Sequence, residues 1–172
     1  MKILVLSDSH SALHLMRAAI RCVKPDAVIH LGDYYDDGAV MEEEFPHLPF
    51  HRVPGNCDKY RRPPFARDVL CYDVCGVRLL MTHGHEHRVK NSLYLLLQDA
   101  RRYEAQAALY GHTHEPDCHR EEDGLWVLNP GSCGYGGGTV GLVETGNGRI
   151  QSCRILNQAD LDALLVAQPD KI

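Results

Sequence analysis

The sequence repeats one pattern five times: a short apolar run ends, and an aspartate, asparagine or histidine follows within a few residues. The runs are 3–6, 27–31, 50–53, 77–82 and 107–110, and the residues behind them are Asp8, His10, Asp33, Asn56, His83, His112 and His114. Short apolar runs bounded by turn residues are typical of buried strands. Because sites in open α/β sheets assemble at the carboxyl ends of strands, we expect these seven side chains to meet at one edge.

The spacing within two of the blocks suits metal coordination. Asp8 and His10 stand two residues apart, and so do His112 and His114. On an extended segment, such residues point to the same side, so each pair could hold a metal ion from one direction. Mixed carboxylate and imidazole ligands suit manganese, iron, cobalt or zinc better than magnesium or calcium. Cysteine is nearly absent from the set, which argues against a closed structural zinc site rich in thiolates.

The candidate ligands are more numerous than one metal ion needs. Two ions require a shared carboxylate, and in hydrolytic sites they commonly stand about 3.5–4 Å apart. Asp33, at the tip of its loop, is the natural bridge. Asn56 would supply a neutral oxygen ligand, and its amide N–H groups would remain free to donate toward a phosphate or hydroxide.

Strands and helices alternate in the first half of the sequence, and hairpins dominate the second half. Residues 12–23, 39–44, 91–103 and 160–166 have helical patterns, with Ser92 as a cap, and residues 32–38 are expected to form a loop. Hairpins are expected from 69–73 with 77–82, 117–121 with 125–128, and 139–144 with 149–155. This mixture predicts a layered α/β domain with a mixed sheet or two packed sheets.

Length and composition fit one globular unit that spans residues 1–172, with 44% hydrophobic residues. The net charge of −5 argues against a protein that coats nucleic acid, and the pairs Arg61–Arg62 and Arg101–Arg102 are too short to change this. Eleven histidines is a high count for this length, and neutral imidazole is a common metal ligand.

Cysteines and apolar runs bear on the compartment. The seven cysteines are odd in number and scattered, without a Cys-x-x-Cys pair, which favours reduced thiols over a disulfide framework. The apolar run at residues 3–6 suits a strand and is too short for a signal peptide, and no apolar stretch is long enough to span a membrane. We therefore expect a cytoplasmic protein without a membrane partner.

The five blocks, in this order, resemble the calcineurin-like metallophosphoesterase superfamily. The matching segments are Asp8-Ser9-His10, Gly32-Asp33, Gly55-Asn56-Cys57-Asp58, His83 and Gly111-His112-Thr113-His114. The small size of the chain and its SDSH, THGH and GHTH segments look most like the compact bacterial and archaeal phosphodiesterase branch. The eukaryotic retromer subunit of the same fold belongs near that branch, and Asn129-Pro130-Gly131-Ser132 also fits it.

The resemblance implies an α/β fold, namely a four-layer αββα sandwich of two mixed β-sheets flanked by helices. It implies one metal ion at Asp8, His10, Asp33 and His114, and a second at Asp33, Asn56, His83 and His112. The ions would be divalent transition metals, manganese first, with zinc, iron, nickel or cobalt as alternatives. A metal-bridging hydroxide would attack phosphorus in line. The substrate would be a small phosphodiester or phosphomonoester, and a homodimer is a further expectation.

One position departs from the pattern of the superfamily. Many members carry histidine after the asparagine of the third block, as the general acid for the leaving group, whereas this sequence has Cys57. The proton would then come from His85 or from water, and a good leaving group needs less help. Cys57 would either touch substrate or be a small buried thiol. Asp58 is expected to form hydrogen bonds behind the ligands.

The remaining histidines have simpler interpretations. His30 stands inside an apolar run and is expected to be a hydrogen-bonded core residue. Surface positions are expected for His14, His47, His51, His87 and His119. Tyr34, Tyr35 and Asp36 either line the rim of the pocket or belong to an exposed loop.

Three classes of function remain open. The first is a metal-dependent phosphodiesterase or phosphatase, the second a non-catalytic scaffold on the same fold, and the third a single-metal hydrolase such as an amidohydrolase. A scaffold can lose metal ligands without penalty, whereas every expected ligand is present here, which favours the enzyme. Amidohydrolases favour a His-x-His near the first strand and a barrel, for which this chain is too short.

Overall fold

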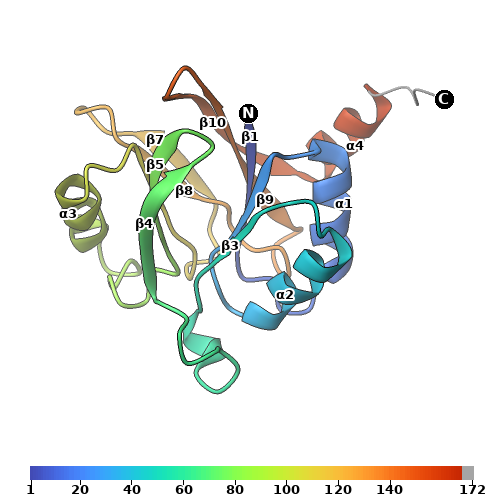
Figure 1. Cartoon of the computed structure of the whole chain (residues 1–172), viewed down its shortest axis with the longest axis horizontal. Helices are drawn as coiled ribbons and strands as arrows, with labels where there is room; N and C mark the ends of the chain where they lie inside the picture. Colours follow the sequence, from blue (N-terminus) through green and yellow to red (C-terminus); the bar gives the residue numbers. More distant parts are fainter. Residues whose placement is uncertain (168–172) are drawn as a thin grey trace.

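The computed structural model describes residues 1–167, which fold into two five-stranded mixed sheets packed face to face (Figure 1). The first sheet has the order β10-β9-β1-β2-β3, formed by Arg149–Asn157, Thr139–Gly146, Lys2–Leu6, Ala27–His30 and Phe50–Arg52. The second has the order β4-β5-β6-β8-β7, formed by Val69–Val74, Val77–Thr82, Ala107–Leu109, Trp126–Asn129 and Asp117–Arg120.

Helices cover the outer face of each sheet, which completes four layers. The helices α1 (Leu13–Val23), α2 (Tyr35–Glu44) and α4 (Gln158–Val166) share a core cluster with the first sheet, and α3 (Tyr94–Arg102) shares one with the second. The αββα sandwich that the resemblance implies is therefore confirmed.

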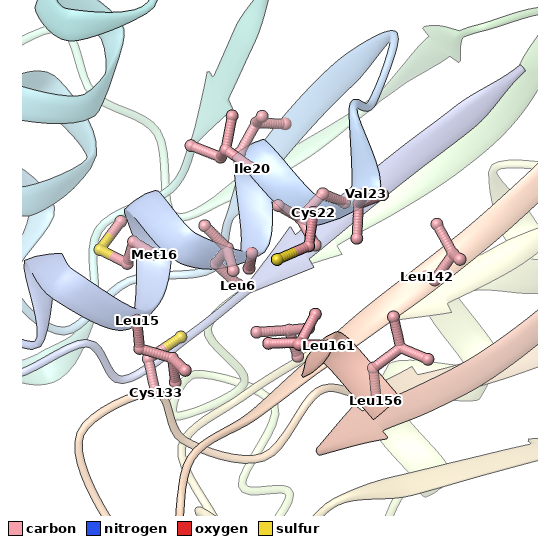
Figure 2. Packing of buried hydrophobic residues seen from close by; sticks show 14 of the residues in the cluster. Leu6, Leu15, Met16, Ile20, Cys22, Val23, Cys133, Leu142, Leu156 and Leu161 are labelled. Atoms are coloured by element: carbon pink, nitrogen blue, oxygen red, sulfur yellow. The ribbon is translucent and has the colours of Figure 1, made fainter. Parts of the chain in front are cut away.

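Side chains alternate along β1 and so serve two cores. Leu4 and Leu6 belong to the cluster under the helices, whereas Ile3 and Val5 belong to the cluster between the sheets, and all four are fully buried. This is the period of two that a strand imposes. Figure 2 shows the helical side of this packing, where side chains of α1 approach Leu6 and Leu161 of α4 lies near Leu142 and Leu156.

Three neighbouring strands in each sheet are parallel. In the first sheet β1 pairs with β2 and β2 with β3, and in the second β5 pairs with β6 and β6 with β8. The expected hairpins β4–β5, β7–β8 and β9–β10 are present as antiparallel pairs. Because parallel strands end on the same side, the loops after β1, β2, β3, β5 and β6 can reach one place.

Three helices begin two or more residues away from the predicted start. α2 begins at Tyr35 instead of residue 39, so the loop expected over 32–38 is wrong beyond Tyr34, whose left-handed backbone (φ 68°) starts the helix early. α3 begins at Tyr94 instead of residue 91, although the Ser92 hydroxyl still accepts a hydrogen bond from the Tyr94 N–H at 3.1 Å. α4 begins at Gln158, where Asn157 caps it.

Across residues 1–167, the helices are all too short or too polar to cross a bilayer.

Candidate metal centre

The loops that follow β1, β2, β3, β5 and β6 converge, and backbone hydrogen bonds join them. The Asp8 N–H donates to the Gly32 carbonyl at 2.9 Å, which ties the first loop to the second. The Gly111 N–H donates to the His83 carbonyl at 3.0 Å, which ties the fifth loop to the fourth. The sequence prediction that these side chains collect at one edge of the sheets agrees with this geometry.

Four of the predicted ligands form a compact group. Asp8, His10, Asp33 and His114 each offer one ligand atom, and these atoms all lie within 4.8 Å of one another, so the group could hold a metal ion. His114 Nε2 is 3.1 Å from Asp8 Oδ1, and His10 Nε2 is 4.0 Å from Asp33 Oδ2.

Two atoms of this group are buried without a hydrogen-bond partner among the described residues, namely Asp8 Oδ1 and His10 Nε2. A buried polar atom left unpaired costs about 1–3 kcal/mol, so native proteins rarely keep one without a reason. A cation bound between a carboxylate oxygen and an imidazole nitrogen would satisfy both atoms. The residues therefore fit a divalent metal ion.

His83 points from the next loop toward the same space. It is fully buried, and its Nδ1 lies 2.8 Å from the Leu31 carbonyl, which can only accept, so Nδ1 carries the proton. In the neutral ring, Nε2 then presents a lone pair, yet it lies 3.1 Å from Asn56 Oδ1 and 3.5 Å from Asp33 Oδ1. Three acceptors that face one another need a shared cation or proton. His112 stands farther out, with its ring centre 5.0 Å from that of His83.

The Asp8 carboxylate is held from behind. Its Oδ2 accepts hydrogen bonds from the Ser7 hydroxyl at 2.6 Å and from the His112 N–H at 3.1 Å, which leaves Oδ1 turned toward the group of ligands. The Ser132 hydroxyl donates to the Asp8 carbonyl at 2.8 Å. Partners of this kind orient metal ligands and raise their affinity.

Asn129 has a similar supporting role for the loop that carries His112 and His114. Its side-chain amide donates to the Thr113 hydroxyl at 2.8 Å and to the Gly111 carbonyl at 3.3 Å. The Asn129–Ser132 segment, noted in the sequence through resemblance alone, thus braces both the first and the last ligand loops.

Asp33 is positioned to stay ionised. Burial raises its pKa, but nearby His83 and the Cys57 N–H, which donates to Asp33 Oδ1 at 2.9 Å, outweigh burial and leave the pKa lowered. The Cys57 side chain itself is exposed, so the expectation of a buried thiol is wrong. Partial desolvation and Asp33 raise the pKa of the Cys57 thiol to about 11.

Asp58 binds backbone and not the other candidate ligands. It is fully buried, its Oδ1 accepts from the Tyr35 N–H at 2.9 Å, and its Oδ2 accepts from the Gly55 N–H at 2.7 Å. These two bonds fix the loop that carries Asn56 against the start of α2, which is a positioning role behind the ligands.

Sequence reasoning missed Asp37, a buried carboxylate in the first turn of α2. Its Oδ2 accepts hydrogen bonds from the Ser9 hydroxyl at 2.7 Å and from the Ser11 N–H at 2.8 Å. Ser9 also contacts Nε2 of His30 at 3.0 Å, and His30 is fully buried, so its predicted core position is confirmed. This network clamps the loop that carries His10. No local pattern could reveal Asp37, because its partners lie more than twenty residues away.

His85 lies beside the group and not within it. Its ring centre is 5.4 Å from that of His83 and 6.1 Å from that of His112, and its buried Nδ1 has no hydrogen-bond partner in residues 1–167. His87, predicted at the surface, is buried, with Nε2 3.2 Å from Asp99 Oδ2. That prediction failed because a helix far along the chain covers the loop.

The backbone at the ligands is strained. Asp8, His10, Asp33, His112 and His114 all have positive φ angles, between 43° and 71°. The extended backbone expected for the pair Asp8 and His10 and for the pair His112 and His114 is therefore wrong, although their loops still converge. Residues other than glycine rarely adopt such angles, and they cluster where function requires a fixed geometry.

Glycines allow the loops to approach so closely. A Cβ at Gly55 would collide with the carboxylate and the N–H of Asp33, and a Cβ at Gly111 would collide with Ser7 Oγ. These two positions therefore need glycine for space.

Two tyrosines border His10 on the open side. The ring of Tyr34 lies 5.0 Å from that of His10, and the ring of Tyr135 lies 4.8 Å from it and stacks on His114 at 5.4 Å. Tyr34 thus lines the rim, as one of the two sequence interpretations held, whereas Tyr35 is buried. Tyr135 had no signal in the sequence.

Comparison with known proteins gives the family of this chain. The sequence model of the calcineurin-like phosphoesterase superfamily domain matches residues 1–148, and the chain belongs to this superfamily. A phosphodiesterase from Methanocaldococcus jannaschii is 29% identical over 167 residues, which cover 84% of this chain and 93% of the relative.

Solved structures agree. A conserved protein from Streptococcus pneumoniae, described as a predicted phosphoesterase, superposes with a TM-score of 0.73 at 28% identity, over 92% of this chain and 90% of its own. Vps29 of Entamoeba histolytica, solved as a zinc complex, has a TM-score of 0.67 at 18% identity over 91% and 99% of the two chains, a likeness of fold.

Proposed function

We propose that this protein is a phosphodiesterase that hydrolyses small phosphate esters at a centre of two divalent metal ions. The observation that carries the proposal is the set of acceptor atoms that face one another with too few donors to satisfy them. Asp8 Oδ1 and His10 Nε2 are buried and unpartnered, and His83 Nε2 faces two oxygen atoms of other loops. Bound cations would satisfy all of them together.

The ligand roles follow from position. Asp33 would be shared by the two ions, because its two oxygens face different groups: Oδ1 lies 3.5 Å from His83 Nε2 and Oδ2 lies 4.0 Å from His10 Nε2. Asp8, His10 and His114 would complete the first site. Asn56, His83 and His112 would complete the second. Manganese is the first choice for such a donor set, with zinc, iron, nickel or cobalt as alternatives.

The bound ions would acidify a water to supply the nucleophile and would neutralise charge on the phosphoryl oxygens. The side chains have separate roles. Asn56 would bind through its oxygen and leave its N–H groups to donate to a phosphoryl oxygen. His83, oriented by the Leu31 carbonyl, would hold its ring fixed during the reaction. His85 would hold the proton for the leaving group.

His85 suits that role better than Cys57 by its position, although burial and nearby His83 lower its pKa. The His85 ring lies beside the rings of His83 and His112, and its Nδ1 makes no hydrogen bond to the described part of the chain. The Cys57 thiol has a pKa of about 11, which is too high for efficient proton transfer near neutral pH.

A diester is the favoured substrate because a relative of matching length is a phosphodiesterase. The odd number and scattered positions of the cysteines suit the reducing conditions of the cytoplasm, where we place the protein.

The primary test uses purified protein stripped of metal with a chelator. Hydrolysis of bis-p-nitrophenyl phosphate and of p-nitrophenyl phosphate is measured before and after manganese is restored. We expect activity only with metal, and more on the diester. If neither ester is hydrolysed after metal binding has been verified, the proposal fails and the non-catalytic scaffold gains support.

The proton donor is tested by leaving group. His85→Gln should slow hydrolysis of a phenyl ester much more than that of a p-nitrophenyl ester, because the better leaving group needs less protonation. Cys57→Ser is the matched control and should slow both esters equally little. An equal loss for both esters in His85→Gln would contradict the assigned role.

A further inference from the structure

A basic and aromatic segment projects beside the candidate metal centre. Residues 59–67, which we call the 59–67 loop, contain two aromatic residues, four cations and no acid, although the whole chain has a net charge of −5. Tyr60 is 91% exposed and Phe65 is 81% exposed. Figure 1 shows the connection between β3 and β4 as a projection beyond the sheets. Exposed rings among several positive charges need a functional reason.

Internal contacts give the loop a defined shape. The Arg61 and Arg62 N–H groups both donate to the Asp58 carbonyl at 2.9 Å, and Asp58 is itself fixed to the start of α2. The Arg62 side chain bonds to Asp68 and to the Ala66 carbonyl, which closes the loop at its base. The dipeptide Pro63–Pro64 restricts the backbone at the turn. The rings are therefore presented at a lower cost in conformational entropy.

The loop is continuous with the metal centre. A cavity of about 400 Å³ is lined by Asn56 and His85 of the candidate site, by Lys59 and Arg62 of the loop, and by the acids Asp68 and Glu86. A second path runs over the surface, where the Arg61 guanidinium lies 5.2 Å from the centre of the Tyr34 ring. Tyr34 in turn borders His10. A ligand with its phosphate at the metal centre could thus extend onto the loop.

Three of the four cations are available to an external anion. Lys59, Arg61 and Arg67 form no ion pair with the rest of residues 1–167, in contrast to Arg62, which pairs with Asp68. Lys59 Nζ lies 5.5 Å from the centre of the Tyr60 ring. Positive charge and an open aromatic face therefore stand together, which is the combination that binds a phosphate and its neighbouring base.

We propose that the 59–67 loop binds single-stranded oligonucleotide next to the scissile phosphate, with bases on Tyr60 and Phe65 and phosphates on Lys59 and Arg61. The inference rests on the proposed function for its placement and narrows the substrate to a nucleotide phosphodiester. An anionic membrane would also attract aromatic rings and cations. Membrane binding would not, however, explain why the loop shares a cavity with residues of the proposed phosphoesterase centre. Charge and shape together favour the nucleic acid.

Binding is tested on metal-stripped protein, so that hydrolysis plays no part. A 5′-fluorescein-labelled hexathymidylate is titrated with protein in a chelator, and fluorescence anisotropy gives the dissociation constant at several salt concentrations. Tyr60→Ala with Phe65→Ala should weaken binding by about tenfold or more, since stacking on one ring is commonly worth that much. Lys59→Gln with Arg61→Gln should reduce the slope of log affinity against log salt by about 1.4.

The chain offers a matched control at the end of α3. The Arg102 guanidinium lies 5.8 Å from the Tyr103 ring, a pair like Lys59 and Tyr60 but distant from the loop. Tyr103→Ala with Arg102→Gln should leave oligonucleotide binding unchanged. Tyr60→Phe should retain it, because the ring remains.

The outcomes separate this inference from the proposed function. If manganese restores hydrolysis of bis-p-nitrophenyl phosphate but the oligonucleotide does not bind, or binds equally well to loop and control variants, the inference is overturned and the enzyme stands. Binding to phosphatidylserine vesicles without binding to the oligonucleotide would also overturn it. Binding that depends on the loop, without hydrolysis of any ester, would support the loop and overturn the phosphoesterase.

Discussion

Charged residues are exposed at one end of the paired sheets and buried at the other. At the amino ends of β6 and β8, a hollow of about 520 Å³ is bordered by Arg101, Arg120, Asp123 and Trp126. Its charges are exposed, and Arg101 is paired, because it bonds to Asp123 at 2.6 Å and to Glu121 at 3.1 Å. Exposed pairs of this kind contribute little to stability and mark no chemistry.

At the carboxyl ends the charges are buried and incompletely paired. Asp8 is fully buried, its Oδ1 makes no hydrogen bond to residues 1–167, and one atom each of Asp8, His10, Asp33 and His114 lie within 4.8 Å of one another. The size of a hollow therefore does not identify a functional site. A site is identified instead by buried acceptor atoms that neighbouring residues hold in place and that lack hydrogen-bond donors, because a bound ligand would satisfy them.

The largest difference between the two ends should come from their carboxylates. Asp33→Asn should reduce hydrolysis of bis-p-nitrophenyl phosphate by more than about 100-fold, because the loss of mere supporting partners already costs about 10–100-fold. Asp123→Asn, the same change at the other end, should leave the rate unchanged. Steady-state kinetics at saturating manganese compares the two variants. Full activity in Asp33→Asn would contradict the role of Asp33 as the shared ligand.

The next largest difference is expected between two glycine-to-alanine variants, because only one of the two glycines lacks space for a Cβ. Gly111→Ala places a Cβ against Ser7 Oγ and Asp8, so we expect a loss of about 1–3 kcal/mol in the free energy of unfolding and a loss of activity. Gly146→Ala meets no atom closer than 3.6 Å and should change neither. Chemical denaturation and the diester assay measure the two effects. Equal behaviour of the variants would show that the loops have room to separate.

A serine hydroxyl that donates to a carboxylate should affect metal affinity only where that carboxylate belongs to the candidate metal centre. Ser7→Ala removes the 2.6 Å hydrogen bond to Asp8 and should weaken metal affinity by about 10–100-fold. Ser152→Ala removes a similar bond of 2.8 Å to Glu144 on the outer part of the first sheet and should leave affinity unchanged. Isothermal titration calorimetry with manganese gives both constants. A wild-type constant in Ser7→Ala would deny this hydroxyl an orienting role.

The last expected effect is on the pH dependence of the free energy of unfolding, and it appears only in acid. Burial and nearby Arg52 lower the pKa of His30 to about 3, whereas an unfolded histidine titrates near about 6.5. Below pH 6.5 the unfolded chain takes up a proton that the folded chain refuses, so stability falls as the pH drops toward 3 and then levels off.

His30→Gln, measured by thermal unfolding in a chelator, should flatten that fall. The exposed His47, replaced in the same way, should leave the curve as steep as in the wild type. A curve in His30→Gln that stays parallel to the wild type would mean that other groups govern the acid limb.

The sequence predicted the strands, and it placed the candidate ligands behind them, because both rest on local signals. Apolar runs such as residues 3–6 specify buried strands, and each ligand follows its strand directly. The convergence of Asp8, Asp33 and His83 follows from parallel pairing, which the alternation of strands and helices indicated. The hairpins were predicted for the same local reason.

What the sequence could not predict depends on contacts between distant segments. Asp37 meets Ser9 only because α2 packs beside the first loop. His87 is buried only because Asp99 of α3 lies over it. The positive φ angles at the ligands are imposed by crowding among five loops, so no local preference signals them. Tyr135 reaches His114 through a glycine-rich loop that has no pattern of its own.

The most direct test of the central claim is a manganese titration of chelator-stripped protein, with bound metal and diester hydrolysis measured on the same samples. If Asp33 bridges two ions, the rate should rise with the second ion bound per chain, and Asp33→Asn should bind fewer ions and remain inactive. A full rate with one ion or none, or two bound ions without hydrolysis, would contradict a two-metal phosphodiesterase.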